Sequence, residues 1–265
     1  MKIEFNKLKA ENRGGFIPFI VAGDPNLETT KDLILELAKQ GASVIELGVP
    51  FSDPVADGVT IQASGERALR NQISVKDILQ VVAEIRADGC EIPIILFGYF
   101  NPILQFGLEK FVEEAVKSSI DGILITDLVP EEAEEFRRIL AAKDLALIML
   151  AAPTSSDERL KKICEKASGF VYAVSRAGVT GVRTDLSNDA ENLVKRLRKF
   201  TDLPIAVGFG ISNSEQVAET WKYADAAVVG SAIVAEIMRI EPNPNNVPDD
   251  FVKRIGEFAR NLLPD

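Results

Sequence analysis

Short apolar runs alternate with amphipathic, charge-rich stretches along nearly the whole chain. The apolar runs are rich in β-branched residues and lack polar alternation, which is typical of strands covered on both faces. Helical patterns lie between them, for example over residues 27–41 and 130–143. The pattern predicts eight strands, at residues 16–22, 44–48, 92–97, 121–126, 145–150, 170–174, 204–209 and 225–230.

Eight strands that alternate with helices predict an α/β fold, a (β/α)8 TIM barrel with a closed parallel sheet. An open, doubly wound sheet has the same local pattern, so periodicity alone leaves that alternative open. No linker-like segment divides the chain, and we expect a single barrel domain over residues 1–265. The Pro- and Asn-rich segment 242–250 is expected to be a turn before a last helix that caps the barrel.

The spacing between predicted strands widens in two places, after the second strand (48–72) and after the sixth (175–190). Long βα loops lie on the catalytic face of a barrel. Both segments are therefore candidates for carrying functional residues.

Composition excludes several classes of function. The formal net charge of −10 argues against a nucleic-acid or membrane-surface partner, since either favours clustered Lys and Arg. Two cysteines, Cys90 and Cys164, do not make a disulfide framework, and no apolar run reads as a signal core or a membrane span, so we expect a cytoplasmic protein. The sequence has no histidine, which excludes Ser-His-Asp and Cys-His catalysis and imidazole zinc sites. Acid–base chemistry is left to carboxylates, Tyr, Lys or water, and no metal is expected.

Two glycine turns indicate a phosphate site. The seventh strand ends in Gly208-Phe209-Gly210, and the eighth ends in Gly230-Ser231 at the start of a helix. Barrels of this kind bind phosphate between these two loops, where backbone N–H groups and a helix N-terminus favour an anion. Gly181, in the loop after the sixth strand, could supply a further donor. Either turn alone could be an ordinary tight turn, but together they favour phosphate binding.

Glu46 is a charged residue inside an apolar strand, where burial is costly unless the carboxylate is used or paired. Alternation places it on one strand face with Val44 and Gly48. If that face lines the barrel, desolvation raises the pKa of Glu46 and suits it to general acid–base work. A structural glutamate paired with an arginine is the alternative. Asp57, in the loop beyond, is a second candidate carboxylate, although Asp-Gly alone usually marks a turn.

Aromatic residues gather at the carboxyl ends of the predicted strands. Core packing explains each one individually, but together they could wall a flat aromatic ligand; they are Phe19, Phe97, Tyr99 and Phe209. Tyr172 could reach the barrel interior or fill the core. No lysine lies at a strand tip, so a Schiff-base aldolase is excluded. Carbon–carbon cleavage on this scaffold would have to proceed without an imine or a metal.

Six segments resemble tryptophan synthase alpha subunits in order and spacing, and the resemblance covers essentially the whole chain. It implies a lyase of tryptophan biosynthesis that cleaves indole-3-glycerol phosphate to indole and glyceraldehyde 3-phosphate by a metal-free retro-aldol reaction. The segments are PFIVAGDP (18–25), IELGVPFSDPVADG (45–58), YFNPIL (99–104), SRAGVTG (175–181), GFGIS (208–212) and GSAIV (230–234).

The resemblance also implies a role for individual residues. Glu46 would take a proton from the glycerol hydroxyl and take part in protonating indole C3, with Tyr172 beside it. Asp57 would stabilise charge at the indole N–H, and Thr180 would close over the substrate. Indole would lie between Phe19, Phe97, Leu124 and Phe209, and the phosphate would be bound by Gly181, Gly210, Gly230 and Ser231.

The resemblance further implies a tryptophan synthase beta subunit as partner, in an alpha2beta2 heterotetramer. Pyridoxal phosphate would belong to the beta subunit, and this chain would need no cofactor. The loops that hold Pro50, Asp53, Pro54 and Asn101 resemble the docking surface. Val59 stands where the family commonly has proline, which would stiffen that loop. A stand-alone lyase that releases indole, a non-catalytic phosphate-binding barrel that activates a partner, and an isomerase barrel of a related pathway are the alternatives.

Overall fold

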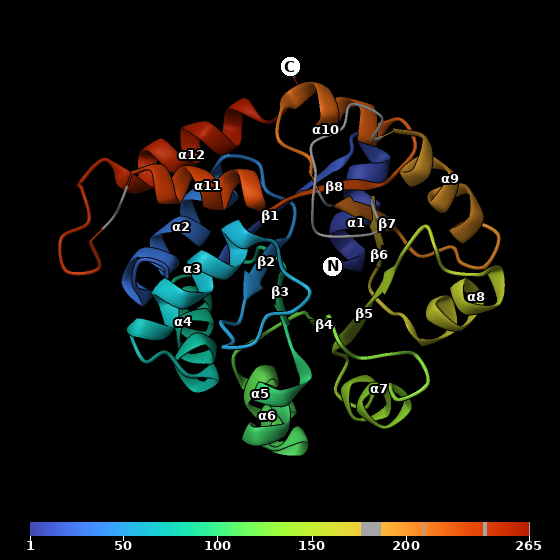
Figure 1. The fold of residues 1–265 in the computed structure, drawn as a ribbon, viewed down its shortest axis with the longest axis horizontal. Coiled ribbons are helices and arrows are strands. Elements are labelled where there is room, and N and C mark those ends of the chain that lie inside the picture. The colour runs from blue at the N-terminus through green and yellow to red at the C-terminus, as the bar shows by residue number, and fades with distance from the viewer. Residues whose placement is uncertain (176–186, 209, 241–242, 265) are drawn as a thin grey trace.

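The computed structural model describes residues 1–175, 187–208, 210–240 and 243–264. Eight parallel strands form a closed barrel in sequence order, shown in Figure 1 with helices around it. Each strand lies within two residues of its predicted position. The strands are β1 (Gly15–Val21), β2 (Ile45–Gly48), β3 (Ile94–Gly98), β4 (Gly122–Ile125), β5 (Ala146–Ala151), β6 (Val171–Val174), β7 (Ile205–Gly208) and β8 (Ala226–Val229).

The β1–β8 ladder decides between the two predicted architectures. Gly15 to Pro18 of β1 pair in register with Ala226 to Val229 of β8, so the sheet has no open ends. An open, doubly wound sheet is therefore excluded, and the (β/α)8 prediction is confirmed. Among the described residues, no helix is long and apolar enough to cross a membrane.

Helices form the outer layer of the barrel. The predicted helix at 27–41 is α2, whose N-cap Asn26 accepts a hydrogen bond from the Thr29 N–H at 2.8 Å, and the one at 130–143 is the shorter α7. The described helices are α1 (Lys2–Ala10), α2 (Leu27–Lys39), α3 (Val59–Arg70), α4 (Val75–Ala87), α5 (Phe100–Phe106), α6 (Leu108–Lys117), α7 (Glu134–Ala141), α8 (Asp157–Lys166), α9 (Ser187–Leu197), α10 (Ser214–Trp221), α11 (Ser231–Arg239) and α12 (Phe251–Asn261).

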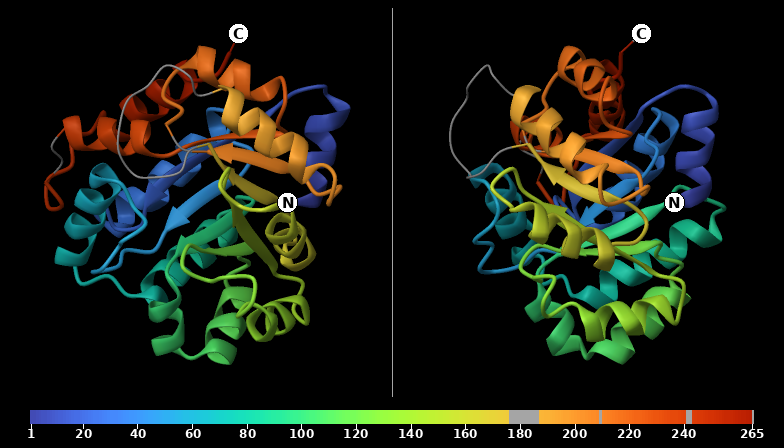
Figure 2. Two further views of the ribbon diagram at one scale, coloured as in Figure 1. Left: turned by 45° about the vertical axis from the view of Figure 1, so that its right-hand side comes forward. Right: turned by 90° about the vertical axis from the view of Figure 1, so that its right-hand side faces the viewer.

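Among the described residues, three helices were not expected from the sequence: α1, α3 and α5. Asn101, predicted to lie in a loop, is in α5. The long segment after β2 is a loop only as far as Gly58, where α3 begins. The N-terminal helix α1 buries Phe5 and Leu8 in the core inside the barrel, and the Phe5 ring lies 5.8 Å from the Phe170 ring. As Figure 2 shows, α1 lies at the opposite end of the barrel from α3, so it closes the end away from the carboxyl ends of the strands.

Apolar side chains form one core between the strands and the helices and a second inside the barrel. The inner core takes alternate residues of each strand, as the pleat requires. It contains Val44, so the same strand face that carries Val44 also directs Glu46 into the barrel. The other members of the inner core include Ile17, Ile95, Leu124, Ile148, Phe170, Tyr172, Ala206, Ala226 and Val228.

Candidate active site

A cavity of about 100 Å³ lies at the carboxyl ends of the strands and is lined by residues from five strands, from the loops that follow β2, β7 and β8, and from the starts of α3 and α11. It brings together eight residues that the sequence predicts as site residues: Phe19, Glu46, Asp57, Phe97, Tyr172, Gly210, Gly230 and Ser231. Three further lining residues, Gly58, Ile61 and Val228, were not predicted. Inward alternation along β8 would have indicated Val228, whereas Ile61 is on the unexpected helix α3.

Glu46 lies in the wall of this cavity, between Phe19 of β1 and Ile95 of β3 in the strand register. The residue is 1% exposed, and its Oε1 atom has no hydrogen-bond partner in the described part of the chain. Burial raises the pKa of Glu46 well above its ordinary value. No ion pair with arginine forms among the described residues, so the geometry does not support a structural glutamate.

Aromatic rings line the side of the cavity next to Glu46. The Phe19 and Phe97 ring centroids are 5.2 Å apart at 76°, and those of Phe97 and Tyr172 are 6.4 Å apart at 61°. Burial and then the charge of Glu46 raise the pKa of Tyr172 well above its usual range, so the phenol keeps its proton. Leu124 is fully buried in the inner core and does not line the cavity. The edge-to-face rings leave an apolar slot suited to a planar ligand.

Glycine makes room for Tyr172 in this wall. A Cβ atom on Gly208 of β7 would lie 2.0 Å from the Tyr172 hydroxyl oxygen, far inside contact distance. The tyrosine hydroxyl therefore occupies the space that a side chain at position 208 would fill.

Asp57 approaches the cavity from the loop between β2 and α3. Burial raises the pKa of Asp57 to about 6, and a hydrogen bond from Tyr99 opposes that shift. Tyr99 itself does not line the cavity beside Glu46, but lies in a small adjoining cavity with Pro50, Pro54 and Asp57. The contact of Tyr99 with substrate stays a prediction.

Three of the predicted phosphate residues, Gly210, Gly230 and Ser231, line the same cavity. Gly230 is the N-cap of α11 and Ser231 is its first residue, with no side-chain cap hydrogen bond among the described residues. The first N–H groups of this helix are therefore free of a side-chain partner at the cavity. Gly210 has φ +82°, a backbone conformation that favours glycine. Thr180, Gly181 and Phe209 lie outside the described residues, and their roles stay predictions.

The predicted docking residues lie on neighbouring elements. Asp53 and Asn101 are exposed, while Pro50 is buried and Pro54 is half-buried. Two apolar side chains are exposed beside them, Val55 of the β2–α3 loop at 74% and Val59, the first residue of α3, at 81%. Exposed apolar side chains next to polar ones are typical of a surface that contacts another protein.

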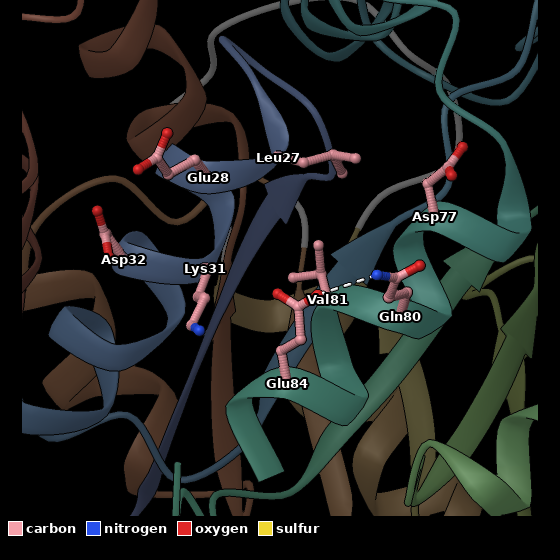
Figure 3. Close-up of a pocket in the computed structure, with 8 residues that line it drawn as sticks. All are labelled: Leu27, Glu28, Lys31, Asp32, Asp77, Gln80, Val81 and Glu84. Carbon is pink, nitrogen blue, oxygen red and sulfur yellow. Dashed lines mark hydrogen bonds between the residues drawn. The ribbon is translucent and has the colours of Figure 1, made fainter. Parts of the chain in front are cut away.

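A larger groove, of about 490 Å³, lies outside the barrel between α2 and α4 (Figure 3). Its walls carry Glu28, Asp32, Asp77 and Glu84, and its one cationic group, Lys31, pairs with Asp88 at 2.7 Å. None of the predicted site residues lines it. Its negative charge would repel a phosphorylated substrate, so the smaller cavity is the better candidate.

The family model described as "Tryptophan synthase alpha chain" matches residues 5–262. The chain belongs to the tryptophan synthase alpha chain family. The predicted function is thereby confirmed: the chain is a carbon–carbon lyase that acts as an alpha subunit in tryptophan biosynthesis. The match also excludes the isomerase alternative.

Individual members of the family agree with this assignment. The tryptophan synthase alpha chain of Geotalea uraniireducens is 49% identical, over 97% of this chain and 94% of that protein. That of Caulobacter vibrioides is 46% identical, over 97% and 93%. The crystal structure of tryptophan synthase subunit alpha from Legionella pneumophila superposes with a TM-score of 0.88 at 35% identity, covering 98% of this chain and 95% of that chain. A chain of the tryptophan synthase a2b2 complex from Pyrococcus furiosus has a TM-score of 0.85 at 39% identity, with 94% and 97% coverage.

Proposed function

We propose that the cavity between Glu46 and Asp57 is where indole-3-glycerol phosphate is cleaved to indole and glyceraldehyde 3-phosphate. One observation carries the assignment: a buried carboxyl group, whose Oε1 atom has no hydrogen-bond partner among the described residues, faces an aromatic slot whose lining also includes the start of α11. A carboxyl group held in this way favours its protonated form and is poised to exchange a proton with a bound ligand.

The two carboxylates take different roles because their surroundings differ. Protonation of the indole ring at C3 makes the ring nitrogen cationic, and the Asp57 carboxylate accepts a hydrogen bond from its N–H. Glu46, having supplied the proton to C3, takes the proton of the glycerol hydroxyl. The carbon–carbon bond then breaks, its electron pair returns to the ring, and the hydroxyl carbon becomes the aldehyde. Glu46 ends the cycle protonated.

Backbone groups would bind the phosphate. The first N–H groups of α11 at Gly230 and Ser231, with those near Gly210, offer neutral donors and the positive end of a helix dipole. Such a local site is consistent with a chain of net charge −10, because it does not depend on the overall field. Gly181 and Thr180 remain candidates for closing the site.

Family membership supports a proposal for the partner and for the cellular setting. The Pyrococcus furiosus relative belongs to an a2b2 complex, and we infer that this chain likewise binds a beta subunit through the surface of Pro50, Asp53, Pro54 and Asn101. The reaction above uses side chains and backbone only, so pyridoxal phosphate is expected on the beta subunit alone. A cytoplasmic location agrees with the two unpaired cysteines. We expect the chain to fold as one domain.

The test is to incubate the purified protein with indole-3-glycerol phosphate, with and without a beta subunit, and to measure indole. Glu46→Gln should lower indole release roughly 100- to 10,000-fold, the range for a lost general acid–base, with KM largely kept. Glu28→Gln, in the outer groove, is the matched control and should stay active. A Glu46→Gln enzyme within tenfold of wild type would refute the role of Glu46. Full activity without the beta subunit would favour the stand-alone lyase.

A further inference from the structure

We propose that Tyr99 is a positioning residue. Its hydroxyl attaches the β2–α3 loop, which contains Asp57, to the ends of β3 and β4. The inference rests on the proposed role of Asp57 at the indole N–H. It assigns Tyr99 no contact with substrate, in contrast to the prediction from its place at a strand end.

The Tyr99 hydroxyl joins two adjacent residues of the loop. It accepts a hydrogen bond from the Ala56 N–H at 3.0 Å, and in the small cavity that both residues line it is close enough to the Asp57 carboxylate to donate to it and lower its pKa. A phenol hydroxyl has one proton and accepts through its lone pairs, so both bonds can form together. Because Tyr99 is 3% exposed, water does not compete freely for them. A single oxygen therefore holds both the backbone and the side chain of this part of the loop.

Tyr99 is itself held firmly by neighbouring elements. It directly follows β3, and the next residue, Phe100, donates its N–H to Asp127 at 2.8 Å, which fixes the start of α5. The Thr126 hydroxyl lies against that of Tyr99 and donates to the Gly98 carbonyl at 3.0 Å. The Tyr99 ring therefore projects from a rigid strand end, as a positioning group requires.

The loop has few other buried attachments. Asp53, Val55 and Ala56 are exposed, so much of the segment faces solvent. Besides the bonds to Tyr99, the Phe51 ring packs on Tyr99 with centroids 5.1 Å apart, and Gln62 donates to the Asp57 carbonyl at 2.8 Å. Loss of the Tyr99 hydroxyl would leave Asp57 fastened through its backbone alone, with its carboxylate free to turn away.

The hydroxyl also affects the charge of Asp57. Burial raises the pKa of this carboxyl group to about 6, and the bond from Tyr99 acts in the opposite direction. Burial and the nearby Asp57 raise the pKa of Tyr99 to about 12, so the phenol remains a donor at neutral pH. Tyr99 thus favours the ionised Asp57 that accepts a hydrogen bond from the indole N–H. Without the hydroxyl, the pKa of Asp57 rises further.

The experiment measures kcat and KM for indole release as a function of pH in wild type and Tyr99→Phe. We expect kcat to fall roughly 10- to 100-fold, as for the loss of a hydrogen bond to a charged group, with little change in KM. The acidic limb of the pH profile should move to higher pH, which a purely structural role would not cause. Tyr223→Phe is the matched control, because it removes a half-buried tyrosine hydroxyl next to Thr220, away from the site.

Ala56→Pro is a second variant, at an exposed position, which removes the N–H that donates to Tyr99 and also fixes φ of residue 56. It should lower kcat in the same direction but less. An acidic limb unmoved in both variants would overturn the proposal.

A double-mutant comparison separates this inference from the proposed function. If Tyr99 acts through Asp57, then Tyr99→Phe with Asp57→Asn should be no slower than Asp57→Asn alone. If the fall in kcat of the double variant equals the falls of the two single variants combined, Tyr99 acts independently of Asp57, and the positioning role would be refuted. If Asp57→Asn itself leaves turnover unchanged, the role of Asp57 fails and the inference fails with it. Absence of cleavage by wild type with a beta subunit would instead refute the proposed function.

Discussion

Replacing Glu46 with glutamine should make the protein more stable at neutral pH. The native carboxyl group is 1% exposed, and burial is the one cause that raises its pKa above the ordinary value of 4.5. Above that value the unfolded chain releases the proton while the native state keeps it. Native stability therefore falls as pH rises through the interval between the two pKa values, by up to about 1.4 kcal/mol per pH unit for one proton. Below pH 4.5 both states keep the proton, so none of this stability is lost.

Glutamine has no titrating proton, so the free energy of unfolding of the variant should lack this contribution to its dependence on pH. Urea unfolding followed by circular dichroism, at a series of pH values from acidic to mildly alkaline, gives the free energy of unfolding of both proteins. The difference, variant minus wild type, should grow with pH from about 5 upward, at up to roughly 1.4 kcal/mol per unit. A difference that is flat, or that shrinks with pH, would mean that native Glu46 is ionised and stabilised by a charge. In that case the description of Glu46 as a buried, protonated carboxyl group would be wrong.

Three further substitutions test the packing. Gly208→Ala should raise KM for indole-3-glycerol phosphate, because the new Cβ would displace Tyr172 into the cavity; an unchanged KM would place the substrate elsewhere. Arg67→Met should lower the free energy of unfolding by about 3 kcal/mol, because it leaves the buried Asp24 without its cation; urea titration would show a smaller loss if solvent reaches Asp24. Gly65→Ala should raise the free energy of unfolding by about 0.5–1 kcal/mol, because Gly65 lies inside α3 and an added Cβ would meet no atom within 4 Å. A lower melting temperature of the variant would contradict this.

The strands were predictable because each is a nearly continuous apolar run, as parallel strands buried on both faces must be. Closure of the sheet was not derivable from that pattern, because the β1–β8 ladder joins segments at opposite ends of the chain. Helix α3 was missed for local reasons. It begins at Gly58 without a capping side chain, and Thr60, Ser64 and Gly65 are weak helix formers, so the segment has the composition of a loop.

The site was predictable where one residue conflicts with its surroundings. Glu46 stands out because a carboxyl group inside an apolar strand is costly unless it is used, and its Oε1 atom has no hydrogen-bond partner in the part of the chain that the structure describes. Tyr99 does not stand out in this way, since an aromatic residue at a strand end fits core packing and ligand binding equally well. Its bonds to Ala56 and Asp57 depend on how the β2–α3 loop folds back over β3, which no local pattern specifies.

Pairing of the first strand with the last also affects how the protein is made. During synthesis, a chain that has not yet produced β8 leaves one side of β1 and one side of β7 without a neighbour. Unpaired strand edges are templates for association with other chains, so the nascent protein is exposed to aggregation until β8 has been made and has paired. The reaction pocket, which needs Phe19 from the start of the chain and Gly230 from near its end, can form only after that hazard has passed.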